Sequence, residues 1–168
     1  HAGMIHGANG LTDYTNRTVA VRTDMDAAAQ VKTLAHELAH VKLHGPDNPD
    51  ATGHRGIGEV EAESVALMIG AAHGMDTSSY TIPYVSGWAG TVKDKDPAEV
   101  VQATGERVRK AAGAILDALP TVQLGGGDPP GLTRDSARAA RAPQAARVAP
   151  PPVEPSRARP AEVVARGL

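Results

Sequence analysis

A glutamate between two histidines forms the pattern in this chain that most strongly predicts a chemical activity. His36 and Glu37 are adjacent and His40 follows, which makes an H-E-x-x-H sequence. Apolar residues around it recur at spacings of three and four, which predicts a helix. Positions i and i+4 share one helix face, so both imidazoles can reach one metal ion. Glu37 would lie beside the metal, where its carboxylate can accept a proton from metal-bound water.

The alternative is a surface helix that carries two solvated histidines. The flanking residues argue against it, because they predict that most of this helix is buried: Ala35, Leu38, Ala39, Val41 and Leu43. Two histidines and a glutamate on a buried helix need partners. The flanks therefore favour a metal site over a solvated face.

A catalytic site of this kind needs a third protein ligand and an open coordination position. The next expected helix carries Glu59, Glu61 and Glu63. Glu59 and Glu63 are four residues apart and share a helix face, whereas Glu61 should point elsewhere. The third ligand is therefore Glu59 or Glu63, and the other can accept the free N–H of a ligand histidine. We expect substitution of Glu61 to change little.

The elements that must position these groups are mostly helices. Hydrophobic periodicity, caps and breakers predict one short strand followed by four helices, at residues 17–22, 27–43, 58–73, 82–89 and 97–119. Asp24 or Asp26 should cap the first helix, and Pro83 should lie in the first turn of the third. Residues 1–16 and 45–57 are rich in Gly, Asn, Asp, Thr or Pro and are expected to be loops. The fold class is α+β, mostly helical with a small sheet.

Composition constrains the site and divides the chain. There is no cysteine, so a metal must be held by His, Asp or Glu. Residues 1–120 carry ten basic and fifteen acidic side chains, and an acidic domain does not suggest a nucleic-acid groove. Residues 121–168 are rich in Pro, Ala and Arg, and we expect a disordered tail. A solvated linker is favoured there over an Arg-rich arm for an anionic partner.

The sequence also bears on location. It has no signal-like segment and no apolar run long enough to cross a membrane, so a cytoplasmic protein without membrane contacts is expected. The chain begins at His1 within a stretch that reads as folded sequence. We therefore expect residues 1–120 to be a domain that lacks its N-terminal part.

The two motif segments resemble a known family. HELAHVKLHG, followed by EVEAESVA, looks like the ImmA/IrrE-type zinc metallopeptidases, and most like the peptidase domain of ArdC-like antirestriction proteins. That family pairs the histidine helix with a downstream E-x-x-A-x-x-aromatic-A segment. Glu59, Ala62 and Ala66 match it, and Val65 stands where an aromatic is usual. The resemblance covers roughly residues 8–119 and implies a zincin-like fold.

The resemblance also implies roles for individual residues. It makes His36, His40 and Glu59 the ligands of Zn²⁺, and Glu37 the catalytic glutamate. Glu63 stands where the family often has Asn or Asp, which is consistent with support of a ligand histidine from outside the ligand set. The single-stranded-DNA-binding domain of ArdC-type proteins has no counterpart in this chain.

Other polar residues have competing interpretations. His44 is in reach of the metal-binding face, but a cap at the helix C-terminus is favoured. His54 and His73 are expected at the surface or at helix ends. The hydroxyl of Tyr80 or Tyr84 could stabilise an oxyanion. The favoured alternative is that both rings fill a core that has no Phe, and Trp88 is expected in the same core.

Together these observations predict a zinc-dependent metallopeptidase. Its substrate would be a regulatory protein such as a transcriptional repressor, with nucleic acid bound only through a domain absent from this chain. One rival is an antirestriction-type binding module with little or no proteolysis. The other is a structural metal site closed by a fourth ligand such as His44, against which Glu37 argues because a structural site needs no base.

Overall fold

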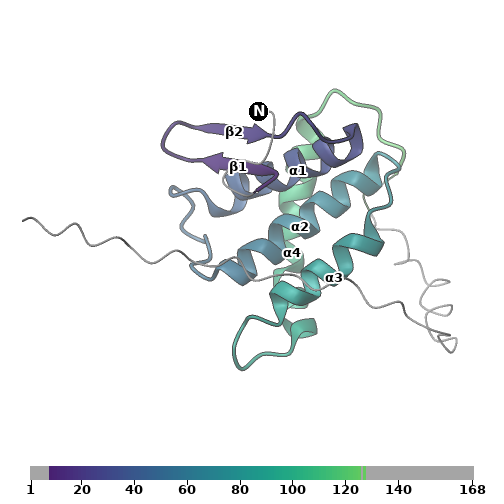
Figure 1. The fold of residues 1–168 in the computed structure, drawn as a ribbon. Coiled ribbons are helices and arrows are strands. Elements are labelled where there is room, and N and C mark those ends of the chain that lie inside the picture. Colours follow the sequence, from purple (N-terminus) through teal and green to yellow (C-terminus); the bar gives the residue numbers. More distant parts are fainter. Residues whose placement is uncertain (1–7, 126, 128–168) are drawn as a thin grey trace, which may run out of the picture.

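The computed structural model describes residues 8–125 and Gly127. In chain order, the elements are β1 (Gly10–Asp13), β2 (Thr18–Val21), α1 (Ala27–His44), α2 (Arg55–Ala72), α3 (Ser78–Ala89) and α4 (Pro97–Ala118). Helix α2 contacts the other three helices, and both strands contact α1 (Figure 1). The expected α+β class, mostly helical with a small sheet, is confirmed for this part of the chain.

The sheet is an antiparallel hairpin in which Gly10 pairs with Val21 and Asp13 with Thr18. Strand β2 lies inside the predicted strand, but the expectation of a loop over residues 1–16 is wrong for β1. The turn residues misled the prediction: the Asp13 carboxylate accepts hydrogen bonds from the Asn16 side chain and backbone N–H at 2.7 and 3.0 Å. Arg17 closes the turn with a φ of 54°.

Helix α1 begins where the Asp26 carboxylate accepts the backbone N–H of Ala29, as one of the two predicted caps. Its buried positions are two alanines, the motif glutamate and one large apolar residue: Ala35, Ala39, Glu37 and Leu43. The expectation that the larger apolar residues are buried is wrong for Val41, which is 43% exposed. Alanines form the packed face because small side chains let the backbones of α1 and α2 approach closely.

Two apolar cores hold the helices together. The larger lies between α1, α2 and α4, and Ala39, Val65 and Ala112 are fully buried in it. The smaller lies between α2, α3 and α4 around Val60 and Ala89, with Trp88 packed half-buried against it.

Two of the last three helices begin earlier than predicted, and α4 begins where it was predicted. Helix α2 begins at Arg55 and α3 at Ser78, each a few residues before the predicted start. Pro83 therefore lies inside α3 rather than in its first turn. Helix α4 begins at Pro97, where the Asp96 carboxylate accepts the N–H of Ala98.

The chain stays against the helices just after α4. The backbone N–H of Leu124 donates to the Ala72 carbonyl at 2.7 Å, and the Gln123 side chain donates to the Leu116 carbonyl at 3.0 Å. The packed region therefore extends past the expected boundary at residue 120. The rest of the expected tail, residues 126 and 128–168, lies outside the described residues. No helix in the described part of the chain is long and apolar enough to span a membrane.

Candidate metal centre

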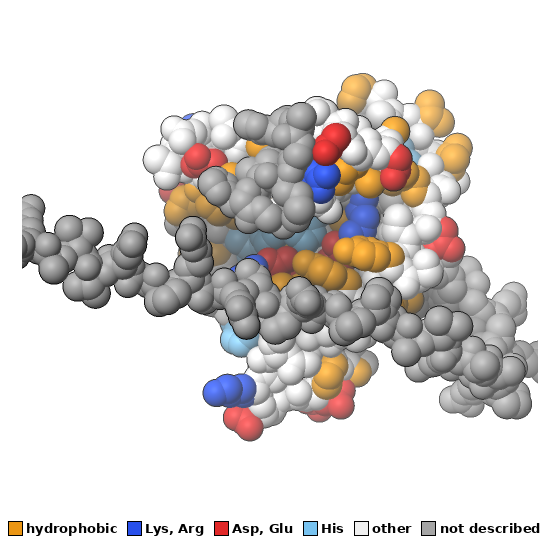
Figure 2. Space-filling model, in the orientation of Figure 1, with side chains coloured by type: hydrophobic (Ala, Val, Ile, Leu, Met, Phe, Trp, Pro, Cys, Tyr) orange, Lys and Arg blue, Asp and Glu red, His pale blue; other side chains and the backbone are white. Residues whose placement is uncertain are grey.

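Three side chains from α1 and α2 converge where the two helices pack together. The Nε2 atoms of His36 and His40 are 3.1 Å apart, and the Glu59 Oε2 atom is 3.5 Å from His36 Nε2. One donor atom from each residue lies within 4.8 Å of the others, which suits a single metal ion. Two imidazoles and a carboxylate are a typical donor set for catalytic zinc. On this face, histidine and acidic side chains adjoin each other in a recess (Figure 2).

The two imidazoles of this cluster have very different proton affinities in the metal-free protein. Burial opposes a charge on His36, but its contacts with Glu59 and Glu63 outweigh burial and raise its pKa to about 9. Burial, together with the charge of His36, lowers the pKa of His40 to about 4. Burial also opposes ionisation of Glu59, yet its hydrogen bond to His36 lowers the Glu59 pKa. One proton is thus held on His36 where a metal would bind.

Glu63 lies behind His36, on the side away from the cluster. Its Oε2 atom is 3.1 Å from His36 Nδ1, and its Oε1 atom accepts a hydrogen bond from the Thr81 hydroxyl at 3.0 Å and pairs with the Lys32 ammonium. Its side chain is 2% exposed. A carboxylate here can accept the Nδ1 proton of His36 and leave the Nε2 lone pair facing the metal position. Glu63 thus lies where it can support His36 from outside the ligand set, as predicted.

Glu61 and His44 form a contact that sequence reasoning missed. Glu61 points away from the cluster as predicted, but it is 1% exposed and its Oε2 atom is 2.8 Å from His44 Nε2. The other ring nitrogen of His44 is 2.8 Å from His40 Nδ1. The predicted C-terminal cap is therefore wrong for His44, and both of its nitrogens are engaged away from the metal position. Substitution of Glu61 was expected to change little, but its contact with His44 gives a reason to expect an effect.

Glu37 is fixed beneath the hairpin. Glu37 is 8% exposed, and its Oε2 atom accepts a hydrogen bond from the Thr12 hydroxyl at 2.7 Å. Gly10 also lies against it, because a Cβ added at Gly10 would come within 2.6 Å of Glu37 Oε1. The Tyr14 hydroxyl donates to the backbone carbonyl of His40 at 3.0 Å. Strand β1 thus positions the motif, and it was missed because its sequence resembles a loop.

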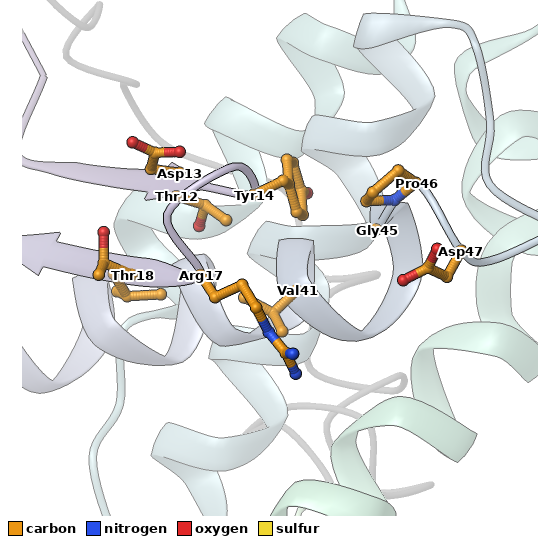
Figure 3. A pocket seen from close by; sticks show the side chains of 10 residues that line it. Thr12, Asp13, Tyr14, Arg17, Thr18, Val41, Gly45, Pro46 and Asp47 are labelled. Carbon is orange, nitrogen blue, oxygen red and sulfur yellow. The ribbon is translucent and has the colours of Figure 1, made fainter.

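A pocket of about 390 Å³ opens between the hairpin turn and the end of α1 (Figure 3). Thr12 and Tyr14 line it on the hairpin side, and Val41 lines it on α1. Arg17 and Asp47 place opposite charges at its edges. Thr12 lines this pocket and also donates a hydrogen bond to Glu37, although Glu37 itself is not among the lining residues.

The tyrosines of α3 form a row along the helix. The Tyr80 and Tyr84 rings stack with centroids 6.0 Å apart, and the Lys32 ammonium lies 4.4 Å from the Tyr80 centroid. Tyr80 is 59% exposed, so the prediction that it fills the core is wrong. Burial raises the pKa of Tyr84 to about 12, with Glu59 and Glu63 contributing, so its hydroxyl keeps its proton. A donor role for either hydroxyl stays a prediction.

His73 is at a helix end, as expected. One of its ring nitrogens, Nδ1, lies 2.8 Å from the Ile69 carbonyl in the last turn of α2, and its Nε2 atom lies 2.8 Å from the Thr121 hydroxyl. His54 is exposed at the start of α2 and makes no capping hydrogen bond with its side chain. Neither residue belongs to the cluster of His36, His40 and Glu59 found in the described residues.

Comparison with known proteins supports the family resemblance. Residues 4–81 match a peptidase family described as the IrrE N-terminal-like domain. The match spans both motif helices and supports the resemblance to the ImmA/IrrE-type family.

An uncharacterized protein of Bacillus anthracis is 28% identical over 118 residues, which cover 70% of this chain and 19% of that protein. The chain thus spans about a fifth of the length of this curated relative. No solved structure matches the chain. The more specific similarity to ArdC-like proteins stays a prediction.

Proposed function

We propose that this protein is a zinc-dependent metallopeptidase. The observation that carries the proposal is the convergence of His36 Nε2, His40 Nε2 and a Glu59 oxygen on one position, next to the turn of α1 that bears Glu37. The match of residues 4–81 to a peptidase family supports the same activity. His36, His40 and Glu59 would hold Zn²⁺ and leave a coordination position open for water or substrate.

Each residue around the metal position has a distinct role in the proposed reaction. Bound zinc would supply a Lewis acid that polarises the scissile carbonyl and makes water more acidic. Glu37 accepts a proton from the attacking water and passes it to the leaving amine. Thr12 holds one oxygen of that carboxylate in place. Glu63 keeps the Nδ1 proton of His36 directed away from the metal position.

The substrate we propose is a regulatory protein, such as a transcriptional repressor, met in the cytoplasm. The support is the resemblance to ImmA/IrrE-type peptidases, whose substrates are often proteins of this kind. Nucleic acid would be bound only through a further domain.

Zinc analysis of purified variants tests the metal ligands. The wild-type protein should bind about one zinc per chain, and His36→Ala, His40→Ala and Glu59→Ala should each lower the affinity severely in competition with a chelator. Glu99→Gln, an exposed position on α4, is the control and should bind zinc normally. Full zinc occupancy in both histidine variants would refute the site.

Cleavage of a proteome-derived peptide library, read by mass spectrometry, tests the activity. The wild-type protein should generate new termini, and Glu37→Gln should keep its zinc but generate none, because an amide cannot accept the proton. A zinc-loaded wild-type protein that cleaves nothing in the library would favour the binding-module alternative. Equal cleavage by Glu37→Gln would exclude the general-base mechanism.

A further inference from the structure

The two predicted ligand histidines are supported in different ways. His36 contacts the carboxylate of Glu63 directly. His40 contacts a second imidazole, that of His44, which in turn contacts the buried carboxylate of Glu61. The inference below rests on the proposed metal site, and it concerns this second arrangement.

The hydrogen-bond geometry allows one assignment of protons if His40 Nε2 is to bind a metal. A free Nε2 lone pair puts the proton of neutral His40 on Nδ1. That N–H must then donate across 2.8 Å to His44 Nδ1, which therefore acts as an acceptor. The proton of neutral His44 consequently lies on Nε2 and donates to Glu61 Oε2 at 2.8 Å. The Glu61 carboxylate can only accept, so it sets the direction of the whole chain.

Burial and charge make this arrangement rigid. The Glu61 side chain is 1% exposed, and its second oxygen lies 3.2 Å from Arg107 Nε, which comes from α4. Arg107 balances the buried negative charge and holds the carboxylate in one orientation. The His44 ring lies against α2 at Gly58, where an added Cβ would touch ring atoms at 3.6 Å. The ring is thus held by α1, α2 and the charge pair together.

We propose that His44, oriented by Glu61 and Arg107, is a positioning residue for the metal site. His44 holds His40 in the tautomer and ring orientation that present Nε2 to the metal. Partners of this kind behind a ligand histidine raise its basicity and keep it preorganised. The site then has two supports, one from Glu63 to His36 and one from Glu61 through His44 to His40. Glu61 acts at this site although it faces away from it.

A pair of amide variants separates the two ring nitrogens of His44. In His44→Asn the side-chain oxygen occupies roughly the position of Nδ1, so an acceptor for His40 remains while the contact with Glu61 is lost. In His44→Gln the amide reaches the position of Nε2, so the contact with Glu61 remains while the acceptor for His40 is lost. His44→Ala loses both, and His54→Ala is the control at an exposed histidine.

Zinc affinity, measured by chelator competition, is the readout. His44→Ala should bind zinc about 10–100-fold more weakly than wild type, and His54→Ala should match wild type. His44→Asn should recover most of the lost affinity and exceed His44→Gln. The visible absorption of the cobalt-substituted proteins reports geometry at the metal, and His44→Asn should resemble wild type more than His44→Gln does.

The outcomes distinguish this inference from the proposed function. If the wild-type protein binds no zinc, the proposed function fails and the inference fails with it. If His36→Ala and His40→Ala lose zinc but His44→Ala binds as wild type does, the inference alone is wrong. If His44→Ala does not fold, the zinc affinities of His44→Asn and His44→Gln test the inference instead. Equal affinities, or tighter binding by the larger glutamine, would show that His44 matters only for packing.

Discussion

Replacing Gly10 with alanine should disturb the predicted catalytic glutamate without touching a metal ligand. Gly10 is buried in β1 directly against α1. A Cβ at this position would lie 2.6 Å from Glu37 Oε1, 2.8 Å from Glu37 Cγ and 2.7 Å from Thr33 Cγ2. Contacts this short cannot persist, so either the glutamate side chain or the strand must move. Either movement should break the hydrogen bond between Thr12 and the Glu37 carboxylate.

The expected loss of stability can be worked from these contacts. Overpacking in a close-packed region costs about 1–3 kcal/mol, and three overlaps at once place Gly10→Ala near the upper end. Alanine lowers the entropy of the unfolded chain and returns about 0.4–1 kcal/mol. The net decrease in the free energy of unfolding should therefore be about 2 kcal/mol. Gly113→Ala is the matched control, because nothing lies within 4 Å of its added Cβ in α4, and it should stabilise the helix by about 1 kcal/mol.

Urea unfolding and zinc competition together check this reasoning. Unfolding of both variants at 25 °C gives the free energies by linear extrapolation. Zinc affinity of Gly10→Ala should stay close to wild type, because the three donors come from α1 and α2, whereas library cleavage should fall. A Gly10→Ala protein as stable and active as wild type would refute the close packing of β1 on Glu37. A similar loss in Gly113→Ala would show that the effect is not specific to β1.

The remaining predictions concern the core, the protons of the site and the end of the packed region. Ile115→Ala should lower the free energy of unfolding by about 2–5 kcal/mol, because Ile115 is 5% exposed. Ile82→Ala should lower it little, because Ile82 is 58% exposed. Urea unfolding of both variants measures the difference. Zinc binding at pH 7 should release about one proton, because a pKa of about 9 keeps His36 protonated in the metal-free protein and the metal needs its neutral form. Zinc affinity should then rise with pH up to about 9, and calorimetry in buffers of different ionisation enthalpy measures the release; a proton count near zero would contradict it. Truncation after Gly125 should leave the midpoint of thermal unfolding nearly unchanged. Truncation after Pro120 should lower the midpoint, because residues 121–125 donate hydrogen bonds to α2 and α4. Equal midpoints for the two truncated proteins would show that these contacts contribute nothing.

Local patterns were enough to place the groups that could bind a metal. The i,i+4 spacing of His36 and His40 puts them on one face of any helix, and the same geometry separates Glu59 and Glu63 from Glu61. The structure brings His36, His40 and Glu59 together, with Glu63 behind His36. Helix geometry had left Glu59 and Glu63 as alternatives for the third ligand, and only the family resemblance favoured Glu59. Helix caps such as Asp26 were also readable, because capping depends on residues only three positions apart.

Contacts between distant segments decided the rest. Strand β1 was not predicted because four residues rich in Gly, Thr and Asp become a strand only when β2 pairs with them. The bond from Thr12 to Glu37 joins residues 25 positions apart, and the pair of Glu61 with Arg107 joins α2 to α4. Helical periodicity shows which way a side chain points, but not what meets it there. Both the sequence prediction and the structure have Glu61 facing away from the metal position. Only the packing of α1, α2 and α4 shows that Glu61 contacts His44, because that contact depends on how separate helices are arranged in space.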